Sequence, residues 1–169
     1  SLWSELGAHP NICRFVDANV GQECLQLPSG LMAGRSEDAF SYVLCEFCNG
    51  GSLVDYLIKN GCALSEAQIV ECMLQIAAGL AHMHSMGVAH RDLKVENVLV
   101  SYPEDESGKP DYEKPTFKIG DFGSATKDHA MDFGSADKKA IGKFLGKIEK
   151  QCTRMYRAPE MLDQYQGFN

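Results

Sequence analysis

The segment HRDLKVEN, at positions 90–97, constrains what this chain can be more than any other part of its sequence. It sets a carboxylate at Asp92, an ammonium group at Lys94 and a carboxamide at Asn97 at fixed offsets within one short stretch. Two further motifs, DFG and then APE, follow it in the chain. One such triplet arises easily by chance, whereas the ordered set of three points to one fold and one chemistry.

These groups are the ones that transfer of a phosphoryl group from ATP requires. Asp92 would accept the proton of the substrate hydroxyl, Lys94 would hold the moving phosphate, and Asn97 would bind a magnesium ion that neutralises phosphate oxygens. Asp121, which opens DFG, would chelate magnesium together with the phosphates. With APE at positions 158–160, the sequence resembles the eukaryotic protein kinases, which implies ATP and Mg²⁺ as cofactors and protein hydroxyls as substrates.

The resemblance implies an α+β fold of the protein-kinase type, in which a hinge joins a small N-lobe to a helical C-lobe. The chain has 169 residues, 44% of them hydrophobic, which is enough for a sizeable core but short for both lobes. It contains no counterpart of the Gly-rich phosphate loop or of the strand lysine. We therefore expect a truncated kinase fold, with the end of the N-lobe over residues 1–47 and the first half of the C-lobe over residues 48–169. Alone, such a piece is expected to be inactive and poorly soluble.

Hydrophobic periodicity and turn residues predict the elements around the motifs. Strands are expected over residues 13–20, 40–47, 98–100 and 116–119. Helices are expected over residues 53–59, capped by Ser52, and over residues 66–86, where Ser65 and Gln68 form a capping box. Residues 101–115 are charged and contain proline, which indicates a surface insertion between two strands.

The stretch between DFG and APE carries a second helical pattern. A helix is predicted over residues 137–151, with lysines interspersed and two glycines, Gly142 and Gly146, that weaken it. We expect its apolar face to pack on the C-lobe and to hold the substrate loop in place without prior phosphorylation. The residues of that face are Ile141, Phe144, Leu145 and Ile148.

The pentapeptide DFGSA occurs twice, beginning at Asp121 and again at Asp132. Only one copy can hold the metal. The first copy follows the strand-like residues 117–120, which would aim Asp121 at the phosphates, whereas residues 128–131 before the second copy have no strand character. We therefore assign metal binding to Asp121.

The resemblance to kinases also implies a nucleotide site. The adenine ring would lie against the hinge formed by Glu46, Phe47 and Cys48, using backbone groups. Cys45 falls where kinases have the gatekeeper residue, and Leu99 resembles the apolar floor under the ring.

Two further features of the resemblance concern substrate class and internal packing. Lys94 in the catalytic loop and Thr153 before APE resemble the serine/threonine type, in which the threonine ties the substrate loop to Asp92 and Lys94. His90 and Phe122 resemble two members of the stack of side chains that couples the kinase lobes, and Phe15 is the expected third.

The three motifs, with their flanking residues, look most like those of the Numb-associated kinase family, which has an additional helix in a long activation segment. The family includes the adaptor-associated, cyclin-G-associated and fungal actin-regulating kinases. It implies phosphorylation of endocytic adaptors, with clathrin-adaptor or actin-regulatory proteins as partners.

Charge and cysteine content limit the partners and the cellular compartment that we expect for this chain. A net charge of −7 disfavours nucleic acid and anionic membranes as partners, and no apolar run is long enough to span a membrane. Seven cysteines without a framework spacing are typical of the reducing cytoplasm. The CEFC segment at positions 45–48 lacks a second ligand pair, so we interpret its cysteines as packing residues rather than as a metal site.

The sequence is also compatible with a second interpretation, a pseudokinase or scaffold that binds partners without transferring phosphate. Pseudokinases usually lack at least one of the four chemical groups at Asp92, Lys94, Asn97 and Asp121, and this chain has all four. The sequence therefore favours an enzyme over a scaffold for the protein that contains it.

Overall fold

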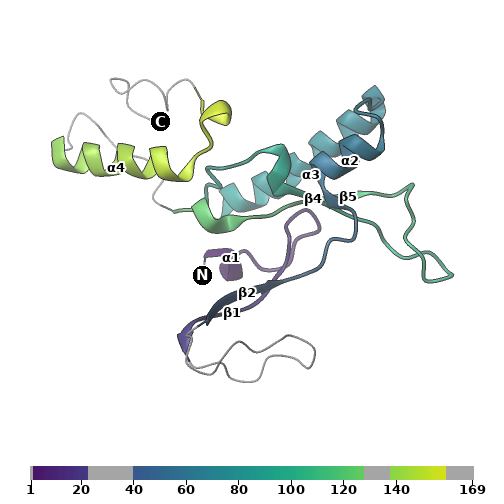
Figure 1. Cartoon of the computed structure of the whole chain (residues 1–169), viewed down its shortest axis with the longest axis horizontal. Coiled ribbons are helices and arrows are strands. Elements are labelled where there is room, and N and C mark those ends of the chain that lie inside the picture. The colour runs from purple at the N-terminus through teal and green to yellow at the C-terminus, as the bar shows by residue number, and fades with distance from the viewer. Residues whose placement is uncertain (1, 23–39, 128–137, 159–169) are drawn as a thin grey trace.

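The computed structural model describes residues 2–22, 40–127 and 138–158, which form two small antiparallel sheets and four α-helices (Figure 1). The first part of the chain holds helix α1 (Leu2–Glu5) and strands β1 (Phe15–Gln22) and β2 (Phe40–Cys45), which pair with each other. The second part holds β3 (Gly51–Ser52), α2 (Leu53–Lys59), α3 (Glu66–Ser85), β4 (Val98–Ser101) and β5 (Thr116–Ile119). Helix α4 (Lys138–Gln151) follows near the end. This mixed architecture confirms the predicted α+β fold.

The predicted elements are all present within the described residues; α2 and β5 have the predicted bounds, and the others differ by one or two residues at an end. Strand β1 begins two residues later than predicted, and β2 ends at Cys45, two residues earlier than predicted. No sequence pattern predicted β3, a two-residue strand that pairs with Leu99 and Val100 of β4. Such a strand is too short to show periodicity.

Both predicted capping serines act as helix N-caps. Ser52 accepts a hydrogen bond from the backbone of Asp55, whose carboxylate accepts one back from the Ser52 N–H, so α2 begins with a complete capping box. Ser65 and Gln68 make the same reciprocal pair at the start of α3. Each box satisfies backbone N–H groups that would otherwise lack partners in the first turn.

The core lies where α3 packs against the hairpin of β4 and β5. Strands β4 and β5 pair antiparallel from Val98–Ile119 to Ser101–Thr116. Figure 1 shows α2 and α3 beside this hairpin. The buried cluster comprises Leu6, Ile12, Leu53, Tyr56, Cys72, Ile76, Met83, Val88, Val98, Val100, Tyr102, Phe117, Ile119 and Phe122.

The residues that precede β1 are tied to this core. The backbone N–H of Cys13 donates to the carbonyl of Ile119 at 2.8 Å, and the N–H of Ile119 donates to the carbonyl of Asn11 at 2.9 Å. The Asn11 carboxamide, which is 7% exposed, also donates to the carbonyl of Phe117 and to the side chain of Gln75. These contacts join the first part of the chain to α3 and β5.

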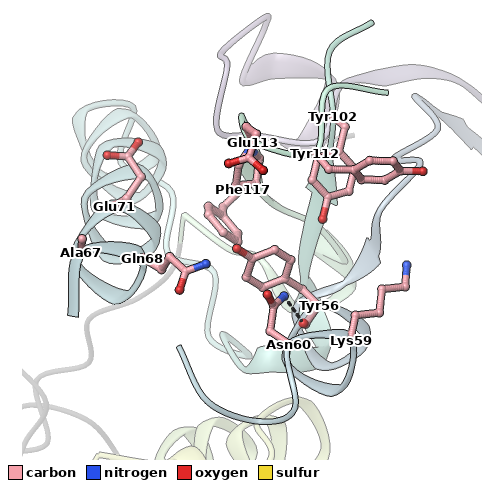
Figure 2. A pocket seen from close by; sticks show the side chains of 11 residues that line it. Tyr56, Lys59, Asn60, Ala67, Gln68, Glu71, Tyr102, Tyr112, Glu113 and Phe117 are labelled. Carbon is pink, nitrogen blue, oxygen red and sulfur yellow. Dashed lines mark hydrogen bonds between the residues drawn. The ribbon is translucent and has the colours of Figure 1, made fainter. Parts of the chain in front are cut away.

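The insertion over residues 101–115 is a hairpin between β4 and β5. The Asp105 carboxylate accepts backbone N–H bonds from Ser107 and Lys109, which closes the turn. With α2 and α3, the base of this insertion lines an open pocket of about 520 Å³ (Figure 2). None of its lining residues belongs to the HRDLKVEN or DFG motifs: Tyr56, Lys59, Asn60, Ala67, Gln68, Glu71, Tyr102, Tyr112, Glu113, Pro115 and Phe117.

The helix predicted between DFG and APE is present as α4. Ile141 and Phe144 are partly buried, and the side chains of Leu145 and Ile148 lie outside the described part of the chain. The packing of this apolar face on the C-lobe therefore stays a prediction. No described helix is long and apolar enough to cross a membrane.

Gly79 of α3 provides a test of the close packing between α3, Asn11 and Ile119. A Cβ atom there would lie 2.7 Å from the carbonyl oxygen of Asn11 and 3.0 Å from Cδ1 of Ile119. Overpacking of this kind costs about 1–3 kcal/mol, which exceeds the gain of about 1 kcal/mol in helix propensity. We expect Gly79→Ala to lower the urea midpoint of unfolding of the full-length protein.

The matched control is Gly142→Ala in α4, where a Cβ would meet nothing within 4 Å. The same change should there leave global stability unchanged or raise it, and should slow hydrogen exchange in α4. Equal effects of the two substitutions would contradict the close packing at Gly79.

Candidate active site

The catalytic loop is fixed by a short bridge and a buried histidine. Ala89 and Thr126 exchange backbone hydrogen bonds of 2.9 Å, which hold the loop beside the DFG segment. His90, which is 3% exposed, hydrogen-bonds the carbonyl of Gly120 through Nε2 at 2.9 Å, and its Nδ1 accepts the N–H of Asp92 at 3.3 Å. Burial is the main reason that the pKa of His90 lies below its ordinary value, so its ring is neutral at pH 7.

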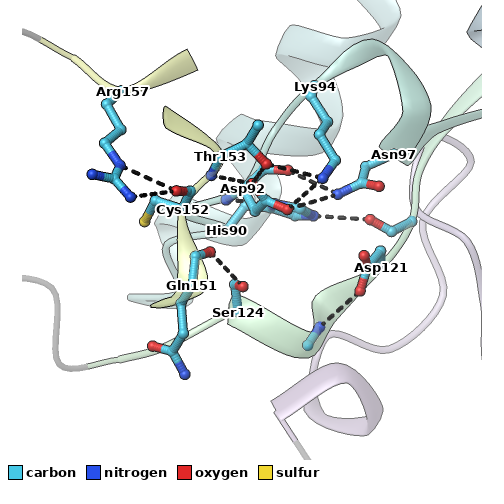
Figure 3. Close-up of polar contacts among 12 residues, drawn as sticks. His90, Asp92, Lys94, Asn97, Asp121, Ser124, Gln151, Cys152, Thr153 and Arg157 are labelled. Carbon is cyan, nitrogen blue, oxygen red and sulfur yellow. Dashed lines mark hydrogen bonds and ion pairs between the residues drawn. The ribbon is translucent and has the colours of Figure 1, made fainter. Parts of the chain in front are cut away.

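The Asp92 carboxylate contacts both Lys94 and Thr153 (Figure 3). Its Oδ1 accepts the backbone N–H of Thr153 at 2.8 Å and the hydroxyl of Thr153 at 2.6 Å. Its Oδ2 lies 3.0 Å from Nζ of Lys94, which also donates to the Thr153 hydroxyl at 3.0 Å. The structure thus brings together the three residues that the sequence assigned to catalysis, although 59 positions separate Lys94 from Thr153.

The surroundings of Asp92 keep it ionised. Burial raises the pKa of this carboxyl, but hydrogen bonds from Thr153 and Lys94 together outweigh burial, so the pKa of Asp92 lies below its ordinary value. The same ion pair is the main reason that the pKa of Lys94 lies above its ordinary value. At neutral pH, the site therefore presents a carboxylate beside an ammonium group.

The two residues predicted as metal ligands lie on adjoining loops. The N–H of Gly120 donates to the carbonyl of Asn97 at 2.8 Å, which joins the end of the catalytic loop to the residue before Asp121. Asn97 is 7% exposed, and its Nδ2 donates to the backbone carbonyl of Asp92 at 2.9 Å. In the described chain, the Asp121 carboxylate accepts one hydrogen bond, from its own turn at Gly123. A carboxylate and an amide oxygen are hard ligands that suit Mg²⁺.

Backbone strain marks both functional loops. Arg91 and Asp121 have φ angles of 68° and 55°, in the left-handed region that non-glycine residues rarely adopt. Each conformation is held by hydrogen bonds, to Ser124 and Gln151 from the Arg91 side chain and to Asp121 from Gly123. Strain at catalytic loops persists only where the surrounding contacts fix it. The second DFGSA copy, at Asp132, lies outside the described residues.

Sequence patterns did not predict an additional contact between the catalytic loop and the activation segment. The guanidinium of Arg91 donates to the carbonyl of Ser124 and to the side-chain oxygen of Gln151, each at 2.7 Å. The hydroxyl of Ser124 in turn donates to the carbonyl of Gln151 at 2.6 Å. The end of α4 is therefore anchored two residues before Thr153. No local pattern in the sequence marks Gln151 as the partner of Arg91.

A row of rings connects the catalytic loop to the first part of the chain. His90 meets Phe122 edge-on with centroids 5.4 Å apart, and Phe122 stacks on Trp3 at 5.0 Å. Trp3 then meets Phe15 edge-on at 5.7 Å. The predicted trio of His90, Phe122 and Phe15 is thus linked through Trp3, a member of the stack that no sequence motif indicates.

Among the residues assigned to adenine binding, Cys45 is the last residue of β2, Glu46 and Cys48 follow it, and Leu99 lies apart on another strand. Cys45 is exposed, Cys48 is buried, and Leu99 is partly buried on β4. Glu46 pairs with Lys118 at 3.0 Å and accepts the N–H of Arg14 at 2.7 Å. Cys13 also lies here, with its sulfur beside Glu46 and Cys48, a proximity that the spacing of the CEFC segment does not reveal.

Comparison with known proteins agrees with this geometry. A family model described as a protein kinase domain matches residues 1–169. The chain belongs to the protein kinase domain family. A probable serine/threonine-protein kinase of Dictyostelium discoideum is 30% identical over 99% of this kinase chain and 13% of its own length. In Saccharomyces cerevisiae, the serine/threonine-protein kinase AKL1 is 31% identical over 97% of the chain and 13% of its length.

A third relative, the actin-regulating kinase PRK1 of Saccharomyces cerevisiae, is 32% identical over 80% of the chain and 16% of its own length. The kinase chain thus spans less than a fifth of each of these relatives. The comparisons support the kinase fold and leave the narrower Numb-associated assignment as a proposal.

The contact of Arg91 with Gln151 leads to a test of how the activation segment is held. Removing the acceptor in Gln151→Ala leaves a charged donor without a partner, which costs about 1.5–3 kcal/mol. We expect hydrogen exchange over residues 148–156 of the full-length kinase to become at least about tenfold faster.

Two variants control this experiment. Gln151→Glu keeps an acceptor for the guanidinium and should retain slow exchange, while Lys150→Ala alters an exposed neighbour and should leave exchange unchanged. Unaltered protection in Gln151→Ala would show that Arg91 does not hold the segment.

Proposed function

We propose that the protein that contains this chain is an ATP-dependent serine/threonine protein kinase. The observation that carries the proposal is the Asp92 carboxylate, which contacts Lys94 of its own loop and Thr153 of a distant segment. An ionised carboxylate at the surface of a fixed loop can accept a proton from an incoming hydroxyl. Relatives named as serine/threonine-protein kinases support the substrate class.

Each residue of the site has a separate task in this proposal. Asp92 orients the substrate hydroxyl and takes its proton as the oxygen attacks the γ-phosphorus of ATP. Lys94, 3.0 Å from Asp92, places a positive charge where the phosphoryl oxygens pass. Thr153 fixes the substrate loop relative to both groups. Mg²⁺, held by Asn97 and Asp121, would neutralise charge on the phosphates.

The nucleotide would bind along the segment that joins the two parts of the chain. We propose that residues 1–47 belong to the N-lobe and residues 48–169 to the C-lobe, with the adenine ring against Glu46 and Cys48. In this arrangement Cys45 borders the rear of the pocket and Leu99 lies beneath the ring. Support comes from the position of Leu99 on β4, next to Gly120 and hence next to the catalytic and DFG loops.

A scaffold without catalysis is the less favoured function. A scaffold has no need of an ionised aspartate paired with lysine, nor of two hard metal ligands on adjoining loops. Asp92, Lys94, Asn97 and Asp121 are all present, and the structure gathers them in one region (Figure 3). The alternative therefore has no observation of its own in its favour.

We also propose a cytoplasmic kinase of the Numb-associated type that acts in endocytosis or on actin regulators. Two observations support this narrower assignment. One is the helix α4 within the activation segment. The other is the relationship to a yeast protein named as an actin-regulating kinase. Its partners would be clathrin-adaptor or actin-regulatory proteins that carry the phosphorylated serine or threonine.

The test uses the full-length protein with radiolabelled ATP, magnesium and a library of peptides. We expect phosphoserine and phosphothreonine among the products. Asp92→Asn should lower kcat by about 100-fold or more with ATP affinity unchanged, because Asp92 contacts the nucleophile rather than the nucleotide.

The control is Glu96→Gln, the same chemical change at an exposed position of the same loop, which should leave kcat unaltered. Mainly phosphotyrosine in the products would refute the substrate class. Full turnover in Asp92→Asn would refute the assigned base.

A further inference from the structure

The chain has a cluster of metal-binding side chains that the kinase chemistry does not use. The sulfur atoms of Cys13 and Cys48 and a carboxylate oxygen of Glu46 all lie within 4.8 Å of one another. We propose that these three residues form a binding site for a soft divalent cation, Zn²⁺ in particular, at the junction between the two parts of the kinase domain.

The ligands come from segments that the backbone already holds together. Cys13 is fixed from one side by its N–H bond to the carbonyl of Ile119. On the other side, the N–H of Glu46 donates to the carbonyl of Arg14 at 3.0 Å, and the Arg14 N–H donates back to Oε1 of Glu46 at 2.7 Å. The three side chains therefore face each other before any ion binds, which lowers the cost of organising the site.

The spacing suits tetrahedral coordination. Zinc binds thiolate sulfur at about 2.3 Å and carboxylate oxygen at about 2.0–2.2 Å, so its ligand atoms lie about 3.5–3.8 Å apart in a tetrahedron. The ligand atoms, which lie within 4.8 Å of one another, are therefore about 1 Å or less from these separations. Three protein ligands leave one position for water.

The charges of the site also balance. Binding of Zn²⁺ to two thiols releases two protons, and the resulting two thiolates and one carboxylate carry one negative charge more than the ion offsets. Nζ of Lys118, 3.0 Å from Oε1 of Glu46, supplies the remaining positive charge. Both described contacts of the Glu46 carboxylate use Oε1, so Oε2 is available to the ion.

Burial separates this site from an ordinary surface cluster. Cys13 is 1% exposed and Cys48 is 8% exposed, and the Cys13 thiol donates to the backbone carbonyl of Glu46. Buried cysteines often serve only as small apolar packing groups, as we interpreted the CEFC segment from sequence. A third ligand from a distant segment, with a paired carboxylate beside it, favours a metal site instead.

The experiment uses the full-length kinase, reduced with a phosphine and freed of metal by dialysis. Zn²⁺ is titrated against a chromophoric chelator, and Co²⁺ alone serves as a spectroscopic probe. We expect a high-affinity site that is lost in Cys13→Ala and in Cys48→Ala, and thiolate-to-cobalt charge-transfer absorption that disappears in the same variants. Glu46→Gln should weaken Zn²⁺ binding by at least about tenfold.

Cys72→Ala is the matched control, since Cys72 is similarly buried at 5% exposure but lies on α3 outside the cluster. It should retain full zinc affinity. Circular dichroism identifies any variant that does not fold, and Cys13→Ala and Cys48→Ala replace ligands from separate segments, so either can decide the question. Absence of a high-affinity zinc site in the wild-type protein, or unchanged affinity in a folded Cys13→Ala or Cys48→Ala variant, would overturn the proposal.

Discussion

The Asp92 carboxylate is the interaction on which the rest of the site depends. Its two oxygens receive the hydroxyl and N–H of Thr153 on one side and the Lys94 ammonium on the other. Hydrogen bonds to an ionised group are about twice as strong as neutral ones, so these contacts position residues far apart in sequence. The buried His90 ring links Asp92 to the residue before DFG. Its Nδ1 accepts the backbone N–H of Asp92, and its Nε2 hydrogen-bonds the carbonyl of Gly120.

The rest of the fold presents this carboxylate in a fixed place. The core between α3 and the hairpin of β4 and β5 holds both ends of the catalytic region, because residues 95–97 lead into β4 and β5 leads into DFG. The Ala89–Thr126 bridge and the contacts of Arg91 then fix the loop and the end of α4. A hydroxyl that enters would meet an oriented carboxylate rather than one that must first be ordered.

Sequence patterns predicted much of this arrangement because local rules govern it. The cap at Ser52 and the capping box at Ser65 placed two helices, and short apolar runs on either side of the catalytic loop and the insertion placed β4 and β5. Long-range contacts could not be predicted in the same way, because no spacing marks them. Gln151 as the partner of Arg91, Trp3 in the stack of rings, and Cys13 beside Cys48 all depend on tertiary folding.

The most direct test of the central claim is a double-mutant cycle between Lys94→Met and Thr153→Ala, measured as kcat/KM of the full-length kinase. Since both side chains contact each other and the same carboxylate, their effects should be strongly non-additive, with a coupling energy of at least about 1 kcal/mol. Effects that add to within about 0.5 kcal/mol would contradict the account, because Lys94 and Thr153 would then act independently of a shared Asp92.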